Sequence, residues 1–113
     1  MSAPLPIHPG PPASTCCAPA VGLDPALAAE RIAELAKALS EPLRVQIVDV
    51  LRRNVEPVCQ CELIALFVVS QPLFSHHMRK LTAAGLVEVE RRHKWAYYSV
   101  PAEAAKELQT WLS

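Results

Sequence analysis

The chain has 113 residues, of which 51% are hydrophobic, and its formal net charge is zero. This length predicts one domain with a thin hydrophobic core. No apolar run is long enough for a transmembrane helix, and residues 1–10 lack the basic residues and the apolar run of a secretory signal. We therefore expect a cytoplasmic protein without a membrane partner. Its four cysteines are then expected to be thiols or metal ligands rather than disulfides.

The zero net charge conceals a basic segment in the second half of the chain. Residues 70–98 hold five Lys or Arg against two Glu, and they also contain His76, His77 and His93. The local excess of charge, rather than the total, is what meets a phosphate backbone. The distribution therefore favours a nucleic-acid-binding face within residues 70–98.

The chain is predicted to divide into a flexible arm, residues 1–24, and a folded domain, residues 25–113. The arm holds six of the eleven prolines and shows no helical periodicity. A first helix is predicted to start at Asp24-Pro25, because Asp is a good N-cap and Pro suits the first helical position. It would present an apolar face of Ala28, Ile32, Leu35, Ala36 and Leu39.

Three more helices are predicted before residue 85. The second runs from about Glu41 to Arg53, with Leu43, Ile47, Val50 and Leu51 as its buried stripe, and the third from about Cys59 to Phe67. The fourth has Ser70 as its N-cap and ends at Ala84, before a left-handed Gly85. Two short helices joined this tightly predict a helix-turn-helix, whose second helix enters the major groove. The side chains of that helix expected to pack inward are Leu73, Phe74, Met78 and Leu81.

The apolar period then changes to two, which predicts a β-hairpin. Val87 to Glu90 alternate, a four-residue turn spans Arg91 to Lys94, and a second strand covers residues 95–100. A last helix follows Pro101, with an apolar face of Ala104, Ala105, Leu108, Trp111 and Leu112. The predicted fold class is mainly α with a small β-hairpin, a winged helix-turn-helix.

Polar side chains on the outer face of the fourth helix are suited to reading DNA. Gln can pair with an adenine edge, Ser with several edges, and Arg with guanine or phosphate. The hairpin would add basic side chains as a wing, whereas His77 is expected to pack or cap. The predicted DNA contacts are Ser70, Gln71, Ser75, His76, Arg79, Lys80, Arg91, Arg92 and Lys94.

Two pairs of cysteines are candidates for a sensing site. Cys59 and Cys61, at i and i+2 around a helix N-terminus, could chelate one ion, and the helix end is expected to lower the thiol pKa. The alternative is a pair of small buried residues. Cys16 and Cys17 lie in the predicted arm, where packing explains them poorly.

Five segments, in order, resemble the ArsR/SmtB family of metal-responsive repressors. They are Ala38–Arg44, Cys59–Leu63, Ser70–Met78, Ala84–Val87 and Trp95–Tyr98. The resemblance covers roughly residues 25–112 and implies a homodimer built on the first and last helices. It also implies a double-stranded DNA operator with two inverted half-sites, which is released when an effector binds. The chain departs from the family at Leu73-Phe74, where members usually have Thr-Val, and at His93, near which the wing turn usually carries Gly.

The resemblance also implies how the cysteines combine. In some members an N-terminal pair folds across to the third helix, so that Cys16, Cys17, Cys59 and Cys61 would form a soft three- or four-thiolate site. Such a site suits arsenite, Cd, Pb or Zn. Ile64 stands where arsenic-type members carry a third helical cysteine, and the last helix has no Asp or His for the family's second site.

Two further interpretations remain open, and an enzyme is not expected. Thiol oxidation could replace metal as the signal for releasing DNA. The chain could also depend on a partner regulator, with a link to nickel. Separately, His8 and the N-terminal amine could bind Ni or Cu. No catalytic triad, phosphate loop or paired acids is visible, and no constitutive cofactor is expected.

Overall fold

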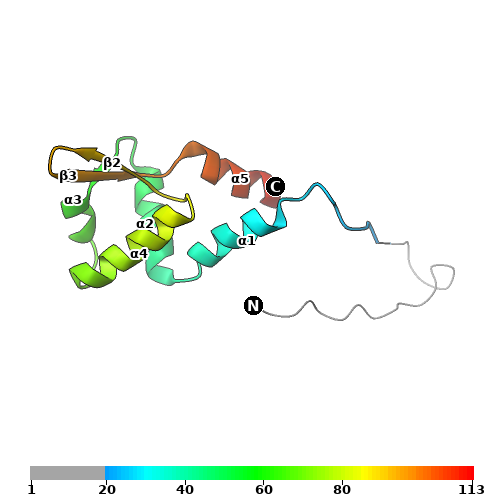
Figure 1. Cartoon of the computed structure of the whole chain (residues 1–113), viewed down its shortest axis with the longest axis horizontal. Helices are drawn as coiled ribbons and strands as arrows, with labels where there is room; N and C mark the ends of the chain where they lie inside the picture. Colours follow the sequence, from blue (N-terminus) through cyan, green and yellow to red (C-terminus); the bar gives the residue numbers. More distant parts are fainter. Residues whose placement is uncertain (1–19) are drawn as a thin grey trace.

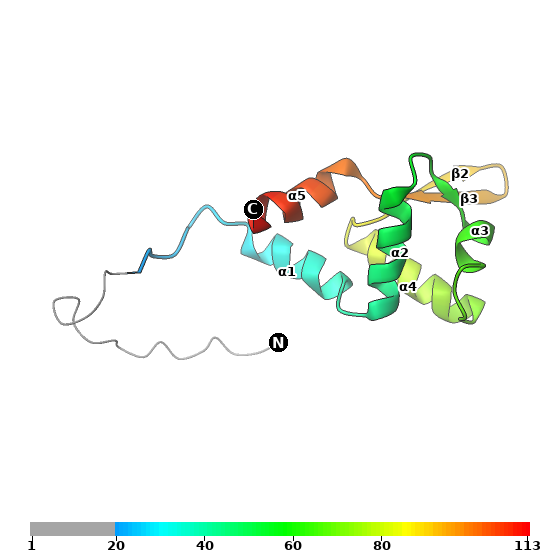
Figure 2. The same cartoon turned by 180° about the vertical axis from the view of Figure 1, so that it is seen from behind.

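The computed structural model describes residues 20–113, so the predicted arm up to residue 19, with Cys16 and Cys17, lies outside the described residues. Figures 1 and 2 show the arrangement of the helices and strands. In chain order they are α1 (Ala29–Ala38), α2 (Pro42–Arg53), β1 (Val58–Cys59), α3 (Gln60–Ile64), α4 (Gln71–Ala83), β2 (Glu88–Arg92), β3 (Trp95–Ser99) and α5 (Ala102–Leu112). This order confirms the predicted winged helix-turn-helix. Within residues 20–113, every helix is too short or too polar to cross a membrane.

The first helix starts later than the sequence predicts. The Asp24 carboxylate accepts a hydrogen bond from the amide of Ala26 at 2.9 Å, and the Asp24 carbonyl accepts one from the amide of Leu27 at 3.2 Å. Asp24-Pro25 thus forms a turn of its own, and α1 begins at Ala29. The prediction of an N-cap here is wrong because an Asp-Pro pair also favours turns.

The wing contains a third strand that the sequence did not indicate. Residues 58 and 59, predicted as a connection and a helix start, pair with β3 in the register Val58–Tyr98 and Cys59–Tyr97. The sheet has the order β1-β3-β2. The third helix is consequently shorter than predicted, covering Gln60 to Ile64.

The core lies where α1, α2, α3 and α4 meet the wing. Leu35, Ile47 and Leu63 are fully buried in it together with Phe74 and Leu81. Leu73 was predicted to pack inward with Phe74, but 48% of Leu73 is exposed. The reason is geometric: Phe74, His77, Met78 and Leu81 already complete the inner face of α4, and Leu73 falls on its flank.

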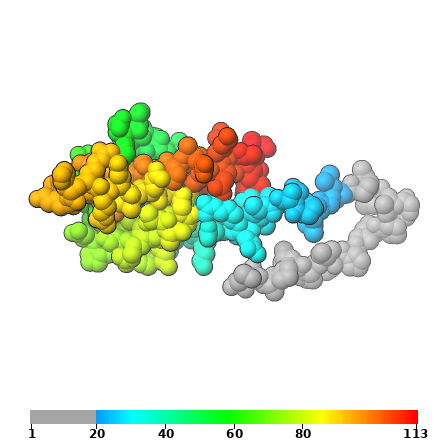
Figure 3. Space-filling view, turned by 45° about the horizontal axis from the view of Figure 1, so that its top comes forward, coloured from blue at the N-terminus to red at the C-terminus, as the bar shows by residue number. Residues whose placement is uncertain are grey.

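The turn of the wing is tighter than predicted. Arg91 and Arg92 still belong to β2, and Arg92 pairs with Trp95, so only His93 and Lys94 make the connection. His93 adopts a φ of 57°. This is the left-handed region that glycine would favour, and His enters it more readily than β-branched residues do. The two-residue turn therefore closes without a glycine. Figure 3 shows the wing at one end of the molecule.

The apolar faces of α1 and α5 are only partly covered in the single chain. The two helices lie side by side at the end of the fold away from the wing (Figures 1 and 2). Leu35 and Ala104 are buried between them and the body, whereas Leu27, Trp111 and Leu112 remain exposed. An apolar surface of this kind is typical of an interface with another molecule.

Candidate nucleic-acid interface and thiol site

Helix α4 is held at both ends, and its outer face presents polar side chains. The Ser70 hydroxyl caps the helix by accepting a hydrogen bond from the amide of Leu73 at 3.3 Å. At the other end Gly85 adopts a φ of +78°, where a Cβ would also lie 3.2 Å from Nη2 of Arg31. Gln71, His76, Arg79 and Lys80 are exposed, and Ser75 is half-buried. The Ser70 hydroxyl is thus already engaged within the helix.

His77 points inward, as predicted, and contacts a buried arginine. Nη1 of Arg44 lies 3.3 Å from Nδ1 of His77. Because a guanidinium can only donate, Nδ1 accepts this bond and the imidazole is neutral. Burial, followed by the charges of Arg44 and His76, lowers the pKa of His77, although Glu41 opposes the shift.

The lowered pKa of His77 predicts a loss of stability in acid. The folded state takes up a proton less readily than the unfolded chain, whose histidine has a pKa of about 6.5. The stabilisation is therefore complete above that value and is lost as the pH falls through the folded pKa. We expect the wild-type midpoint of urea unfolding to fall between pH 7.5 and 5.5, and to fall less in the His77→Gln variant. An equal fall in both proteins, with His76→Gln as the control, would contradict this assignment.

The wing separates its two arginines onto opposite faces, because neighbouring residues of a strand point in opposite directions. Arg91 lines a hollow with Ser75 and Arg79 of α4. Arg92 instead forms an ion pair with Glu90 at 2.7 Å and lies over the ring of Tyr97. Of the two, Arg91 is the one placed to act together with α4.

The cysteines of the third helix lie next to each other and next to the wing. The sulfurs of Cys59 and Cys61 are 3.1 Å apart, with Cys59 buried and Cys61 exposed. A cavity of about 290 Å³ at the two thiols is lined also by Ile64, by Gln71 of α4 and, from the wing, by Arg91, Lys94, Trp95 and Ala96. The thiol pair thus borders both of the elements predicted to contact DNA.

The helix end does not lower the pKa of Cys61, contrary to the prediction. The hydrogen bond with Cys59 is the main cause that raises the pKa of Cys61, and partial burial adds to it. The backbone amide of Glu62 acts in the opposite direction but more weakly. The hydrogen bond between the two sulfurs favours the protonated form of Cys61, and this effect outweighs that of the short helix α3.

Arg31, which the sequence did not single out, joins three helices. Its Nε donates to Glu107 of α5 at 2.9 Å, and its Nη1 donates to the carbonyl of Ala84, at the end of α4, at 2.7 Å. The same guanidinium is paired with Glu34. The partly exposed α1–α5 pair is thereby tied to the end of the candidate recognition helix.

A signal for the two structural arginines does exist in the sequence. Arg31 lies four residues before Leu35, and Arg44 lies three before Ile47, so each occupies an apolar face. A charged residue at such a position is expected to have a specific partner. Periodicity indicates that a partner exists but does not identify it.

Comparison with known proteins identifies the family. The family model described as "Bacterial regulatory protein, arsR family" matches residues 41–89, from the start of α2 to β2. An HTH-type transcriptional regulator of Methanocaldococcus jannaschii is 33% identical, over 70% of this chain and 88% of its own length. The arsenical resistance operon repressor of Staphylococcus xylosus is 32% identical, over 66% of this chain and 69% of its own. This chain belongs to the ArsR family.

A further relative and two solved structures extend the comparison. The repressor SmtB of Mycobacterium tuberculosis is 42% identical over 65 residues, but this chain spans only 47% of its length. The ArsR family regulator RHA00566 has a TM-score of 0.68 at 23% identity, over 77% of this chain and 88% of that one. The homodimeric winged helix-turn-helix domain Mb0332 of Mycobacterium bovis has a TM-score of 0.62 at 23% identity, over 74% of this chain and 78% of that one. These two structures share the fold, and the family makes the chain a DNA-binding transcriptional regulator.

Proposed function

We propose that this ArsR-family chain is a homodimeric repressor that releases an inverted-repeat operator when a thiophilic metal or metalloid binds its cysteines. One observation carries the proposal. The thiol pair Cys59 and Cys61 shares a cavity with Gln71 of α4 and with Arg91 and Lys94 of the wing. A ligand on the two sulfurs would therefore lie beside groups that contact DNA.

The proposed DNA contacts come from α4 and the wing. We expect Gln71, Ser75, His76 and Arg79, which lie outside the buried face of α4, to read base edges in the major groove. Lys80, Arg91 and Lys94 are exposed and supply charge for the phosphate backbone. Ser70 and Arg92 are weaker candidates, since the first caps α4 and the second is paired with Glu90.

The proposed dimer uses the surface of α1 and α5. Leu27, Trp111 and Leu112 form an exposed apolar surface there, and a second copy of the chain would cover it. A twofold axis through this surface would present two α4 helices to successive major grooves, which corresponds to inverted half-sites about one helical turn apart.

The residues at the thiol site fit a soft ion, but they complete only part of its coordination. Thiolates are the ligands that arsenite, Cd, Pb and Zn prefer, and arsenite takes three. Within residues 20–113 no group of three or more His, Cys, Asp or Glu side chains could hold a metal, and Ile64 borders the cavity as an apolar side chain. The missing thiolates would come from Cys16 and Cys17, which lie outside the described residues.

We expect strand β1 to couple the thiols to the DNA contacts. Cys59 is the last residue of β1 and pairs with Tyr97 of the wing strand β3. To bind a shared ion, the two thiols would release their protons to solvent and lose their mutual hydrogen bond, and we expect this to displace Cys59. Through the ladder this displacement reaches the wing, whose Arg91 lies next to Arg79.

The test is an effector titration of the full chain on DNA. A duplex is first selected from a randomised library with the reduced apo protein, and anisotropy then follows its release by arsenite, Cd, Pb, Zn and Ni in turn. We expect nanomolar apo binding and release by a soft ion. The Cys59→Ser/Cys61→Ser variant should bind the duplex equally well and show no release, and Cys16→Ser/Cys17→Ser should respond only at much higher ion concentration.

The outcomes distinguish the remaining alternatives. Retention of every ion response in Cys59→Ser/Cys61→Ser would contradict the thiol site. Release by peroxide alone, reversed by a thiol reductant, would establish thiol oxidation instead, for which the distance of 3.1 Å between the sulfurs is also suitable. Salt-sensitive binding without sequence preference would favour a regulator that depends on a partner.

A further inference from the structure

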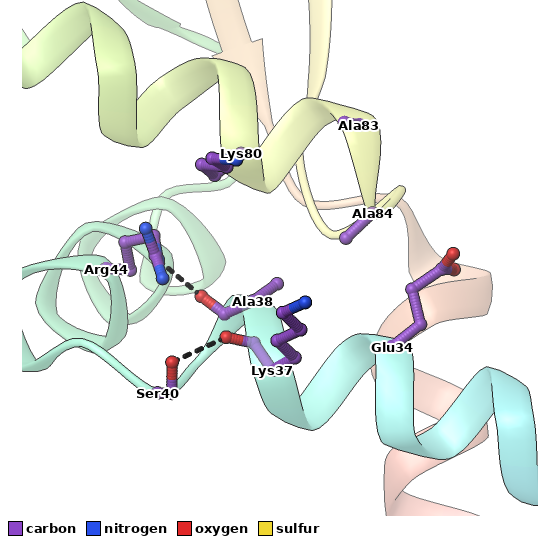
Figure 4. Close-up of a pocket in the computed structure, with 8 residues that line it drawn as sticks. All are labelled: Glu34, Lys37, Ala38, Ser40, Arg44, Lys80, Ala83 and Ala84. Carbon is purple, nitrogen blue, oxygen red and sulfur yellow. Dashed lines mark hydrogen bonds between the residues drawn. The ribbon is translucent and has the colours of Figure 1, made fainter. Parts of the chain in front are cut away.

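A second hollow, which we call the α1–α4 pocket, lies on the other side of the recognition helix from the wing. It has a volume of about 260 Å³, and its lining includes Lys37, Ala38, Ser40, Arg44, Lys80 and Ala84. Figure 4 shows that these residues come from the end of α1, the start of α2 and the last turns of α4. None of them belongs to the thiol site.

The α1–α4 pocket is positively charged without a counter-ion. Lys37, Arg44 and Lys80 form no ion pair with any carboxylate of the described residues. The one acid in the lining, Glu34, is already paired with Arg31. Three cations thus border one small hollow, and the one acid that lines it is neutralised by Arg31. Glu41, whose charge reaches His77, does not line the pocket.

Arg44 makes this arrangement unlike an ordinary basic surface. Only 8% of Arg44 is exposed. Its Nε donates to the carbonyl of Ala38 at 2.7 Å and its Nη1 to His77, so both acceptors are neutral. Buried charges in proteins are normally paired with an opposite charge. Nη2 has no hydrogen-bond partner among residues 20–113 and is not enclosed, which leaves a donor for a ligand in the pocket.

The negative ends of the helix dipoles beside the pocket are compensated in part. Both α1 and α4 end at the pocket, and Arg31 binds the Ala84 carbonyl at the end of α4. The Ser40 hydroxyl donates a hydrogen bond to the carbonyl of Lys37, and the Arg44 guanidinium donates one to the carbonyl of Ala38. Without these bonds, both carbonyl oxygens would present partial negative charge. The first turn of α2, a helix of 12 residues, has no side-chain cap. The amides of that turn add to the positive potential of the three cations.

The position of the pocket indicates which anion it meets. Lys80 and Ala84 lie on one flank of α4, while Ser75 and Thr82 lie on the other flank with Arg91 of the wing. A helix that fills a major groove about 12 Å wide has one phosphate backbone on each flank. With α4 in such a groove, the wing would meet one backbone and the α1–α4 pocket would face the other.

We propose that the α1–α4 pocket holds a phosphate group of the DNA backbone, bound by Lys37, Lys80 and Arg44 on the flank of α4 away from the wing. The inference rests on the proposed binding of DNA through α4 and assigns a second backbone contact to it. A contact of this kind fixes the position of α4 in the groove and carries no sequence information.

The test compares two charge-matched double variants of the full chain. Lys37→Gln/Lys80→Gln removes two pocket charges, and Arg52→Gln/Arg53→Gln removes two exposed charges at the far end of α2. Anisotropy on the selected duplex between about 50 and 200 mM KCl gives the slope of log K against log salt. The pocket variant should flatten the slope by about 0.9 per half-site, which weakens binding about fivefold per half-site at about 0.15 M salt. The control should keep the wild-type slope.

Neutral methylphosphonates placed one at a time along the duplex locate the phosphate. We expect one position in each half-site to weaken wild-type binding about fivefold and to leave the pocket variant unaffected. A wild-type slope in the pocket variant, with only its melting temperature lowered, would overturn the inference. The lysines would then merely complement the C-terminal ends of α1 and α4.

Two further outcomes show whether the anion is free or part of DNA, and whether a failure of this inference extends to the proposed function. If inorganic phosphate at millimolar concentration shifts the amide resonances of Ser40 and Arg44, and the duplex does not, the pocket binds a free anion and the assignment to DNA is wrong. If the wild-type chain selects no duplex at all, the proposed function and this inference both fail. Loss of the pocket effect alone leaves the proposed function intact.

Discussion

Replacing Phe74 by alanine is expected to lower the free energy of unfolding by about 3–5 kcal/mol. Phe74 is fully buried at the second turn of α4, and its ring centroid lies 6.1 Å from that of Phe67. Truncation removes this contact and leaves a cavity between α3 and α4, which a thin core cannot close. Urea unfolding at a fixed protein concentration measures the change, because the proposed dimerisation would add to the apparent stability.

Leu73→Ala is the matched control for this prediction. Leu73 is the neighbouring residue of the same helix and is 48% exposed, so we expect a cost below about 1 kcal/mol. If the two substitutions cost the same, α4 is rotated from the orientation described, and its outer face would carry different residues to DNA.

Replacing Arg79 by alanine is expected to weaken binding to the selected duplex by roughly 5- to 150-fold, corresponding to about 1–3 kcal/mol for a bidentate contact with a base. Arg79 is exposed on the outer face of α4 and lies beside Ser75 and Arg91. The variant should also lose discrimination at one base pair of each half-site, which anisotropy on duplexes with single substitutions measures.

Arg92→Ala removes the same charge from the opposite face of the wing. Arg92 is paired with Glu90, so we expect this variant to bind within about threefold of the wild type, as for an exposed ion pair. A larger loss for Arg92→Ala than for Arg79→Ala would mean that the wing, rather than α4, dominates binding. An Arg79→Ala variant with lower affinity but unchanged base preference would reassign Arg79 to the phosphate backbone.

The hydrogen bonds of Arg31 connect the proposed dimer surface to the proposed DNA-binding helix α4. α1 and α5 would form the dimer, and the carbonyl of Ala84 at the end of α4 is bound by the same guanidinium that binds Glu107. The spacing of two α4 helices in a dimer therefore depends on the α1–α5 pair directly. A shift of α4 or of the wing would therefore change how well the spacing of the two DNA-binding surfaces fits the two half-sites of the operator.

Local signals in the sequence were enough to predict α4 and its surroundings. The Ser70 cap, the proline in the first turn and the left-handed Gly85 each act within a few residues, so they specify the limits of the helix without reference to the rest of the fold. The same holds for the hairpin, whose alternation is local. The predicted family likewise rests on short segments in order, and the comparisons confirm it.

By itself, the sequence determined the order of helices and hairpin, the outer face of α4 and the presence of a thiol pair. Only the tertiary structure decided which residues lie next to those features. Strand β1 has two residues, too few for a periodicity, and it exists because Tyr97 and Tyr98, some 40 positions later, pair with it. The apolar periodicity of a sequence also cannot specify which distant polar group will bind a given carbonyl or pair with a given charge in the fold. The α1–α4 pocket, the Arg31 tie and the proximity of the thiols to the wing are long-range contacts, and packing alone brings their residues together.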